Sequence, residues 1–246
     1  TQGVSSAASD VYKRQAKDKL TVEPNPIRDT TTEFSTDTAE KVASLNPTKI
    51  IAVNSGLEAD KKALLEQIAP TTFHSDEYQD WQVPWDAQVK EISKALGKEE
   101  EGQKLIDDAE QAFEDFREAH PELQGKTAVI GMPYDGKFGV YTSGDGRGSF
   151  IEKLGFKIPE KFNGDGSSFF LDWSPENYAD FNDVDYLFVL DYYGAIDALK
   201  NDENFMDLDV NKRGGLYWLD TDTANAMSMP NPLSIPYAVE QIEEQL

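Results

Sequence analysis

The chain has 246 residues, no cysteine, 39% hydrophobic residues and a formal net charge of −23 at pH 7. The lack of any thiol excludes disulfide scaffolds, iron–sulfur clusters and cysteine nucleophiles. Only His74 and His120 are available for a zinc site or a Ser-His-Asp triad. The sequence therefore does not favour a zinc enzyme or a serine hydrolase. The acidic charge repels nucleic acid and anionic membranes, so we expect no polyanionic partner.

The first residues differ from the rest of the chain. Residues 1–15 are small and polar without periodicity, which predicts a foreign or disordered leader outside the fold. From residue 16 the sequence predicts an α/β lobe that continues to residue 97. After a turn-rich lead-in, its elements are a helix from Ser35 or Thr36 to Asn46, a buried parallel strand over 49–53, a helix over 58–68 and a strand over 69–73.

The middle of the chain reads as two helices separated by Gly97. The first covers 85–96, and the second covers 98–119 with an apolar stripe from Leu105 to Phe116. We interpret residues 98–119 as an interlobe helix because the α/β pattern starts afresh after Gly125. A second lobe over 120–246 is predicted from strands at 127–131, 139–142, 184–190 and 215–219 and helices at 149–154, 173–181, 195–199 and 235–245. The predicted fold class is therefore α/β, with two Rossmann-like lobes joined by a rigid backbone helix.

Two loops carry possible ligand chemistry. Residues 142–149 are rich in glycine, contain Arg147 and precede a helix, so their free N–H groups and the guanidinium could hold an oxygen-rich ligand. The loop lacks the Gly-Lys-Ser/Thr ending of a nucleotide-binding P-loop, and a solvated glycine turn is the alternative. The Asp207-x-Asp209-x-Asn211 segment departs from a calcium loop at its sixth and twelfth positions, which favours an ordinary polar loop and no metal site.

Aromatic residues gather after predicted strands. Ligands bind at strand ends in open α/β sheets, and an aromatic cleft with little charge suits a bulky organic molecule. For each aromatic residue taken alone, a place in the core is the alternative. The candidate ligand-binding residues are Ser55, Tyr78, Trp81, Trp85, Tyr134, Phe138, Tyr141, Arg147, Tyr192 and Tyr193.

Several motifs occur in a characteristic order. They are residues 39–52 (AEKVASLNPTKIIA), 68–71 (IAPT), 150–156 (FIEKLGF), 173–176 (WSPE) and 232–238 (PLSIPYA). In this order the chain resembles, over about residues 33–246, the substrate-binding proteins of ATP-driven iron–siderophore and cobalamin importers. That resemblance implies the class III periplasmic-binding-protein fold, in which one rigid helix joins two α/β lobes.

The resemblance also implies a function and a compartment. Such a protein is a non-enzymatic receptor without a cofactor of its own, which binds a ferric siderophore in the cleft between its lobes and delivers it to the subunits of an ABC permease. It works outside the cytoplasmic membrane, free in the periplasm or held by a lipid anchor. By motif position, Glu40 and Glu176 are the permease-docking glutamates; a favourable contact with a helix dipole is the alternative for each.

The front of the chain departs from this pattern. Members of the family begin with a signal sequence, often with a lipid-carrying cysteine, followed by a strand and a helix before the equivalent of Glu33. The resemblance therefore leads us to expect a truncated chain with an incomplete first lobe.

The arginine content narrows the expected ligand. The chain has five arginines, and Arg147 is the one expected at the cleft, which favours a ferric complex of low charge such as a hydroxamate. A cobalamin or haem receptor is the alternative within the family, with His74 as a possible haem ligand. From other classes, a carboxylate-dependent α/β hydrolase and an assembly module without a small ligand remain open.

Overall fold

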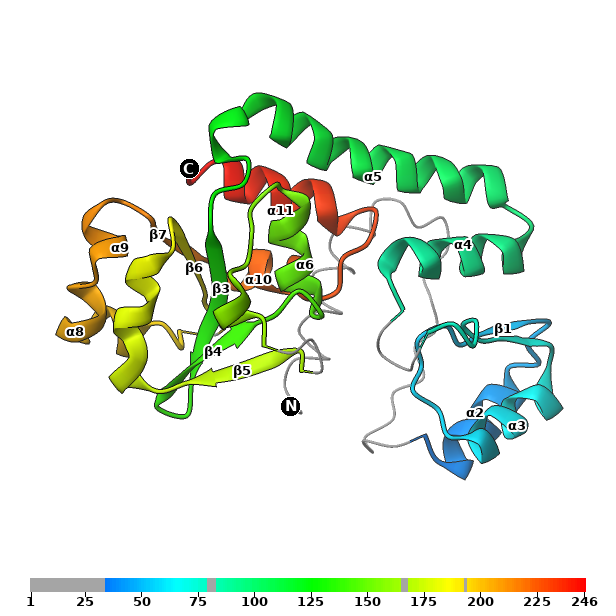
Figure 1. Ribbon diagram of the computed structural model, residues 1–246. Helices are drawn as coiled ribbons and strands as arrows, with labels where there is room; N and C mark the ends of the chain where they lie inside the picture. Colours follow the sequence, from blue (N-terminus) through cyan, green and yellow to red (C-terminus); the bar gives the residue numbers. More distant parts are fainter. Residues whose placement is uncertain (1–33, 79–82, 165–167, 193) are drawn as a thin grey trace. The chain divides into compact units, whose positions relative to one another are not determined.

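The computed structural model describes residues 34–78, 83–164, 168–192 and 194–246 (Figure 1). Two candidate site residues, Trp81 and Tyr193, lie outside these ranges, as do the predicted leader and most of the lead-in. The described chain divides into two compact units, and the boundary falls between Asp107 and Asp108. We call the described residues up to Asp107 the first unit and those from Asp108 the second unit.

The first unit follows the predicted order of elements. It contains α2 (Thr36–Ser44), β1 (Ile50–Ile51), α3 (Ala59–Ile68), β2 (Thr71–Thr72) and α4 (Trp85–Leu96). Ser35 caps α2 by accepting a hydrogen bond of 3.2 Å from the Thr38 amide, as the sequence predicted. The strand predicted over 49–53 is shorter and less buried than expected, with Ile51 37% exposed. The described residues give β1 one parallel partner, β2, and a two-stranded sheet covers little of each side chain.

The helix α5 (Glu99–Ala119) belongs to both units. Gly97 separates it from α4 in the left-handed conformation that helix-ending glycines adopt. In the first unit, Gly102 meets α4 so closely that an added Cβ would lie 2.3 Å from the Ser93 Cβ. In the second unit, the Phe113 ring lies 4.9 Å from the Phe150 ring. The apolar stripe is narrower than predicted, because Leu105 is 46% exposed.

The second unit is built on a mixed sheet of five strands in the order β5-β4-β3-β6-β7. The strands are β3 (Ala128–Tyr134), β4 (Lys137–Tyr141), β5 (Phe170–Trp173), β6 (Tyr186–Leu190) and β7 (Leu216–Leu219). Strands β3, β6 and β7 are parallel, whereas β4 and β5 run antiparallel to their neighbours. The tight β3–β4 turn at Asp135 and Gly136 has positive φ at both residues, which suits a two-residue hairpin.

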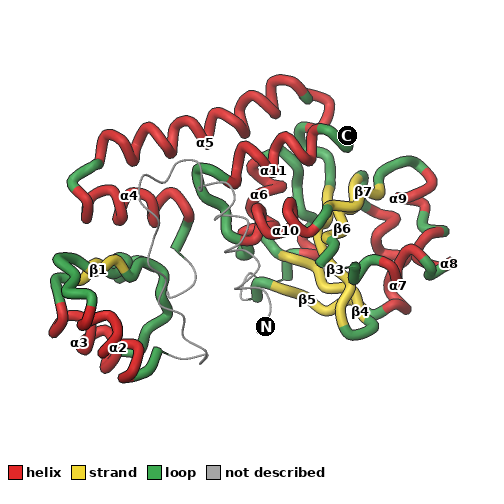
Figure 2. Tube along the Cα trace, turned by 180° about the vertical axis from the view of Figure 1, so that it is seen from behind, coloured by secondary structure: helices red, strands yellow, loops and turns green. Residues whose placement is uncertain are grey.

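Helices cover both faces of this sheet (Figures 1 and 2). One side has α6 (Gly146–Lys153), α10 (Thr221–Ser228) and α11 (Ser234–Glu243), and the other has the 3-10 helix η3 (Pro175–Asp183), α7 (Asp197–Lys200), α8 (Glu203–Met206) and α9 (Asp209–Lys212). Short 3-10 turns η1 (Pro121–Leu123) and η2 (Glu160–Phe162) complete the unit.

Three parts of the second unit differ from the prediction. The helix expected over 173–181 is wrong at its start, since Trp173 ends β5 and the helix begins at Pro175 as a 3-10 helix. The helix α6 begins at Gly146 rather than at Ser149. Its first residues include two glycines, which in a sequence indicate a loop rather than a helix. The helices α8, α9 and α10 were not predicted, because two are a single turn long and α10 has a mostly polar sequence.

Candidate ligand-binding site

Arg147, the one arginine expected at a ligand site, is buried and ion-paired. Its side chain is 10% exposed and that of Asp145 is 15% exposed. Asp145 Oδ1 accepts from Arg147 Nε at 2.7 Å, and Oδ2 accepts from the terminal Nη2 at 3.1 Å. The same Oδ1 accepts from the Arg147 backbone amide at 2.8 Å, which makes Asp145 the N-cap of α6. The guanidinium charge is thus balanced within the protein, and a role of Arg147 in holding an oxygen-rich ligand stays a prediction.

The guanidinium nitrogen that does not bind Asp145 contacts two tyrosines. Arg147 Nη1 donates to the hydroxyls of Tyr141 and Tyr192, both at 3.0 Å, and its Cζ lies 3.8 Å from the centre of the Tyr141 ring. Each hydroxyl also donates a hydrogen bond of its own. Tyr192 donates to the Ala224 carbonyl of α10 at 3.2 Å, and Tyr141 donates to the Met132 sulfur at 3.2 Å. We call Tyr141, Asp145, Arg147 and Tyr192 the arginine cluster.

Burial controls the protonation of the arginine cluster. It raises the pKa of the Tyr141 and Tyr192 phenols, against the opposing effect of the Arg147 charge. Burial also disfavours the charge on Arg147, but the neighbouring Asp145 carboxylate outweighs it, so the pKa of Arg147 is raised. Near neutral pH the cluster therefore presents neutral phenols around a charge-balanced ion pair.

The glycines of the 142–149 loop bring α6 against the sheet. A Cβ on Gly148 would lie 1.9 Å from the Thr142 carbonyl oxygen, and one on Gly146 would lie 3.1 Å from Pro230 Cδ. Glycine is required at Gly148 because the two backbones approach so closely, whereas at Gly146 the fit is only tight. This contact fixes the first turn of α6, and with it the start of the Arg147 side chain.

Exposed apolar side chains flank the same loop. Phe169 is 41% exposed and lies next to Gly144, and Met229 is 44% exposed and directly precedes the Pro230 that packs on Gly146. Large exposed apolar groups beside a buried polar cluster are typical of a site for an organic ligand.

Phe138 is not part of the arginine cluster. Its ring is fully buried in the core, 5.1 Å from the Phe181 ring and 5.9 Å from the Phe205 ring. The reason is the two-residue period of a strand: Phe138 and Tyr141 are three residues apart on β4 and point to opposite faces of the sheet. The structure thus corrects the placement of Phe138 from a ligand contact to a core residue.

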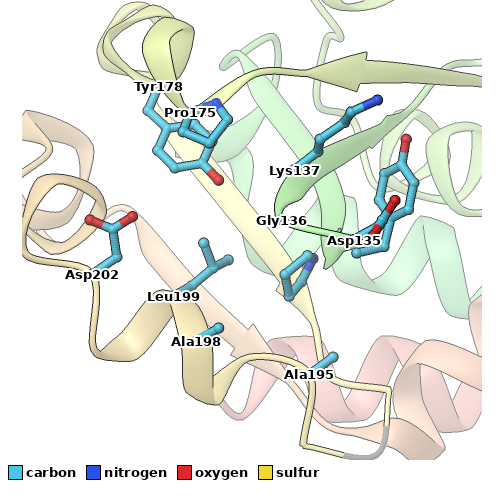
Figure 3. Close-up of a pocket in the computed structure, with 11 residues that line it drawn as sticks. Asp135, Gly136, Lys137, Pro175, Tyr178, Ala195, Ala198, Leu199 and Asp202 are labelled. Atoms are coloured by element: carbon cyan, nitrogen blue, oxygen red, sulfur yellow. The ribbon is translucent and has the colours of Figure 1, made fainter.

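Tyr134 lines a separate pocket of about 280 Å³ at the tip of the β3–β4 hairpin (Figure 3). Hairpin residues 133–137 form one wall, and Tyr178, Leu199 and Asp202 lie across from them. The charged groups near Tyr134 are paired with each other, because Asp172 accepts from both the Tyr134 hydroxyl and Lys137. Tyr134 contacts the arginine cluster through another ring, since the Phe170 ring lies 5.1 Å from both the Tyr134 ring and the Tyr141 ring.

In the first unit, the candidate residues follow strand ends, as predicted. Ser55 follows β1, and Tyr78 lies six residues beyond β2; both are half-buried. The buried oxygens Asn54 Oδ1 and Ser55 Oγ have no hydrogen-bond partner among the described residues. Trp85 begins α4 and is 9% exposed. Ser55 and Asn54 thus offer polar atoms that a ligand could satisfy.

Two members of the site were not found from sequence. Asp145 was read only as part of a glycine-rich loop, although an Asp just before a helix is an N-cap signal and its i, i+2 spacing to Arg147 allows an ion pair. The sequence could not predict which backbone carbonyl of α10 accepts from Tyr192, because every residue has the same backbone acceptor.

Metal-binding groups are sparse in the described ranges. No three His, Asp or Glu side chains there are close enough together to hold a metal ion. Lys212 lies 3.0 Å from Asp207 and 3.6 Å from Asp209, and Asp209–Lys212 form the single-turn helix α9 rather than the polar loop predicted there. Among the described helices, none combines the length and apolarity needed to cross a bilayer.

Two compact α/β units that share one long helix, with aromatic and hydroxyl groups beside a helix start, define the class of solute-binding proteins with a class III fold. The chain belongs to the periplasmic binding protein family, whose model matches residues 2–220. The match includes residues 2–15, so the assignment of that segment as a leader stays a prediction.

Named relatives in this family handle ferric complexes. The Fe(3+)-citrate-binding protein YfmC of Bacillus subtilis (strain 168) is 26% identical over 189 residues, which cover 75% of this chain and 57% of YfmC. The iron uptake ABC transporter substrate-binding protein PiaA from Streptococcus pneumoniae TIGR4 is 28% identical, with 96% of this chain and 81% of PiaA covered and a TM-score of 0.72. PiaA in complex with ferrichrome gives 28% identity, coverage of 96% and 79%, and a TM-score of 0.74. The resemblance to siderophore-binding proteins found in the sequence is thereby confirmed.

Proposed function

We propose that this protein is an extracytoplasmic receptor that binds a ferric siderophore and delivers it to an ABC permease. Its family and the iron-binding relatives support this role. We infer a non-enzymatic role, as in other solute receptors, in the periplasm or on a lipid anchor at the cell envelope.

The observation that carries the ligand class is the charge balance of the arginine cluster. Arg147 is paired with Asp145, and it offers the site two neutral tyrosines rather than a free cation. A multiply charged chelate would find no compensating charge in this cluster, whereas an uncharged ferric hydroxamate would lose little solvation energy on entering it. We therefore propose a low-charge ferric complex, consistent with the ferrichrome bound to PiaA.

The name of YfmC gives the second candidate, ferric citrate, which is anionic. Fluorescence quenching by ferrichrome, a ferric catecholate, ferric citrate, cobalamin and haem separates the candidates in one experiment. We expect the tightest binding for ferrichrome. Tightest binding of citrate or of the catecholate would overturn the proposed ligand class, and tightest binding of cobalamin or haem would assign the alternative receptor. Hydrolysis of a model ester with no binding of any complex would favour the hydrolase.

Permease docking belongs to the same proposal. Glu40 on α2 and Glu176 in the first turn of η3 are both exposed, and each unit contributes one of them. Exposed carboxylates can form charge-assisted bonds with permease arginines. Charge reversal at both positions should abolish uptake in cells while purified protein still binds its ligand. Undiminished uptake by the double variant would remove these two residues from the docking surface.

A further inference from the structure

Asp145 has two separable roles in the arginine cluster. As the N-cap of α6, it needs only an acceptor oxygen for the Arg147 amide, which it holds at 2.8 Å. As the partner of the guanidinium, it supplies a full negative charge through contacts of 2.7 Å and 3.1 Å. Asparagine is as good an N-cap as aspartate but carries no charge, so one substitution separates the two roles.

The charge of Asp145 acts where screening is weak. The side chains of Arg147 and Asp145 are 10% and 15% exposed, and Tyr141 and Tyr192 both accept from the Nη1 nitrogen of the guanidinium. Charges at such depth are little screened by salt and act over several ångströms. With Asp145 ionised, a ligand beside the tyrosines meets nearly no net charge. Without it, the same ligand meets an unbalanced guanidinium.

We propose that Asp145 is the residue that determines charge selectivity at this site: by neutralising Arg147 it makes the site prefer uncharged over anionic ferric chelates. This inference rests on the proposed function, in that it assumes that the arginine cluster faces the ligand. It goes further because it assigns the ligand's charge class to one carboxylate that need not touch the ligand. The predicted role is one of specificity, so Asp145→Asn should change the ratio of the affinities for anionic and uncharged chelates rather than abolish binding.

The test compares two probes on three proteins. Dissociation constants for ferrichrome, which is uncharged, and for ferric dicitrate, which is anionic, are measured by fluorescence quenching on wild type, Asp145→Asn and Asp220→Asn. Asp220 is the matched control, because it is the exposed N-cap of α10, accepts from the Thr223 amide at 2.8 Å and does not bind Arg147. Both variants remove one negative charge from the same unit and keep the cap.

We expect Asp145→Asn to shift the dicitrate-to-ferrichrome affinity ratio about tenfold toward dicitrate, which corresponds to about 1.4 kcal/mol. The ratio should stay within about twofold of wild type in Asp220→Asn, which fits the screening of an exposed charge. An unchanged ratio in a folded Asp145→Asn protein that still binds ferrichrome overturns the inference and leaves the proposed function standing. Wild-type protein that binds neither probe overturns the proposed function itself.

A second variant guards against misfolding. If Asp145→Asn has lost its native circular dichroism, Asp145→Ser supplies a cap oxygen without a charge and should show the same shift in the ratio.

Discussion

Removing the Arg147 guanidinium should destabilise the second unit strongly, and removing its charge partner at the same time should restore part of the loss. At an effective dielectric constant of about 20, two unit charges 4 Å apart attract by about 4 kcal/mol, and desolvation offsets part of this. The Arg147→Met variant leaves the Asp145 carboxylate buried without its cation and deprives two tyrosine hydroxyls of a donor. We expect a loss of about 3 kcal/mol in the free energy of unfolding.

The Asp145→Asn/Arg147→Met double variant has no unpaired charge, so it should be more stable than Arg147→Met alone by about 1–2 kcal/mol. Urea unfolding followed by circular dichroism measures both values. If the two units unfold in separate transitions, the change should fall in the transition of the unit that begins at Asp108. A double variant that is less stable than Arg147→Met would refute the view that the two charges depend on each other.

Three further predictions concern the surroundings of the arginine cluster. Gly148→Ala should lower the free energy of unfolding by about 2 kcal/mol, because the new Cβ would lie 1.9 Å from a backbone oxygen. Gly144→Ala should lower it by under about 0.5 kcal/mol, because the nearest atom to its Cβ would be 3.5 Å away, and thermal unfolding of the two variants compares them. Tyr192→Phe should cost about 1–2 kcal/mol in urea unfolding, since Ala224 and Arg147 each lose a partner; no loss would show that water replaces the hydroxyl. Hydrogen bonds from Thr127 lower the pKa of Asp185, so on acidification the unfolded state binds the proton first, and the carboxylate stabilises the fold above about pH 4 but no longer does so once the pH falls through its folded pKa. Asp185→Asn should therefore reduce the loss of unfolding free energy on acidification by under about 1 kcal/mol. An unchanged dependence of stability on pH in the acid range would contradict this.

The sequence predicted elements whose signal is local. Short apolar runs located β3, β6 and β7, helical periodicity located the long α5, and Gly97 marked the break before it. It could not predict the order of strands, because pairing is decided by contacts between distant segments. The rule that ligands bind at strand ends assumes a parallel sheet. Strand β4 is antiparallel and runs toward the start of β3. The register still sets Val140 opposite Gly131, which in turn pairs with Val189, so the carboxyl ends of β4 and β6 lie at nearly the same level on either side of β3.

The sequence also predicted only part of the site. Tyr141, Arg147 and Tyr192 do come together, because both tyrosine hydroxyls accept from the same nitrogen, Arg147 Nη1, at 3.0 Å. Phe138 was misplaced because a list of aromatics near a strand end ignores which face each one occupies. The neutralisation of Arg147 was missed because a count of arginines says nothing of what each is paired with.

The boundary between the two units lies inside α5, and this limits how the protein can be dissected. A fragment that began at Asp108 would cut a continuous helix, leaving newly exposed N–H groups on one piece and carbonyls on the other. It would keep the Phe113 contact with Phe150 but start without a natural cap. Separate expression of the second unit should therefore begin at Gly97, where the chain already turns, so that the helix enters the fragment whole.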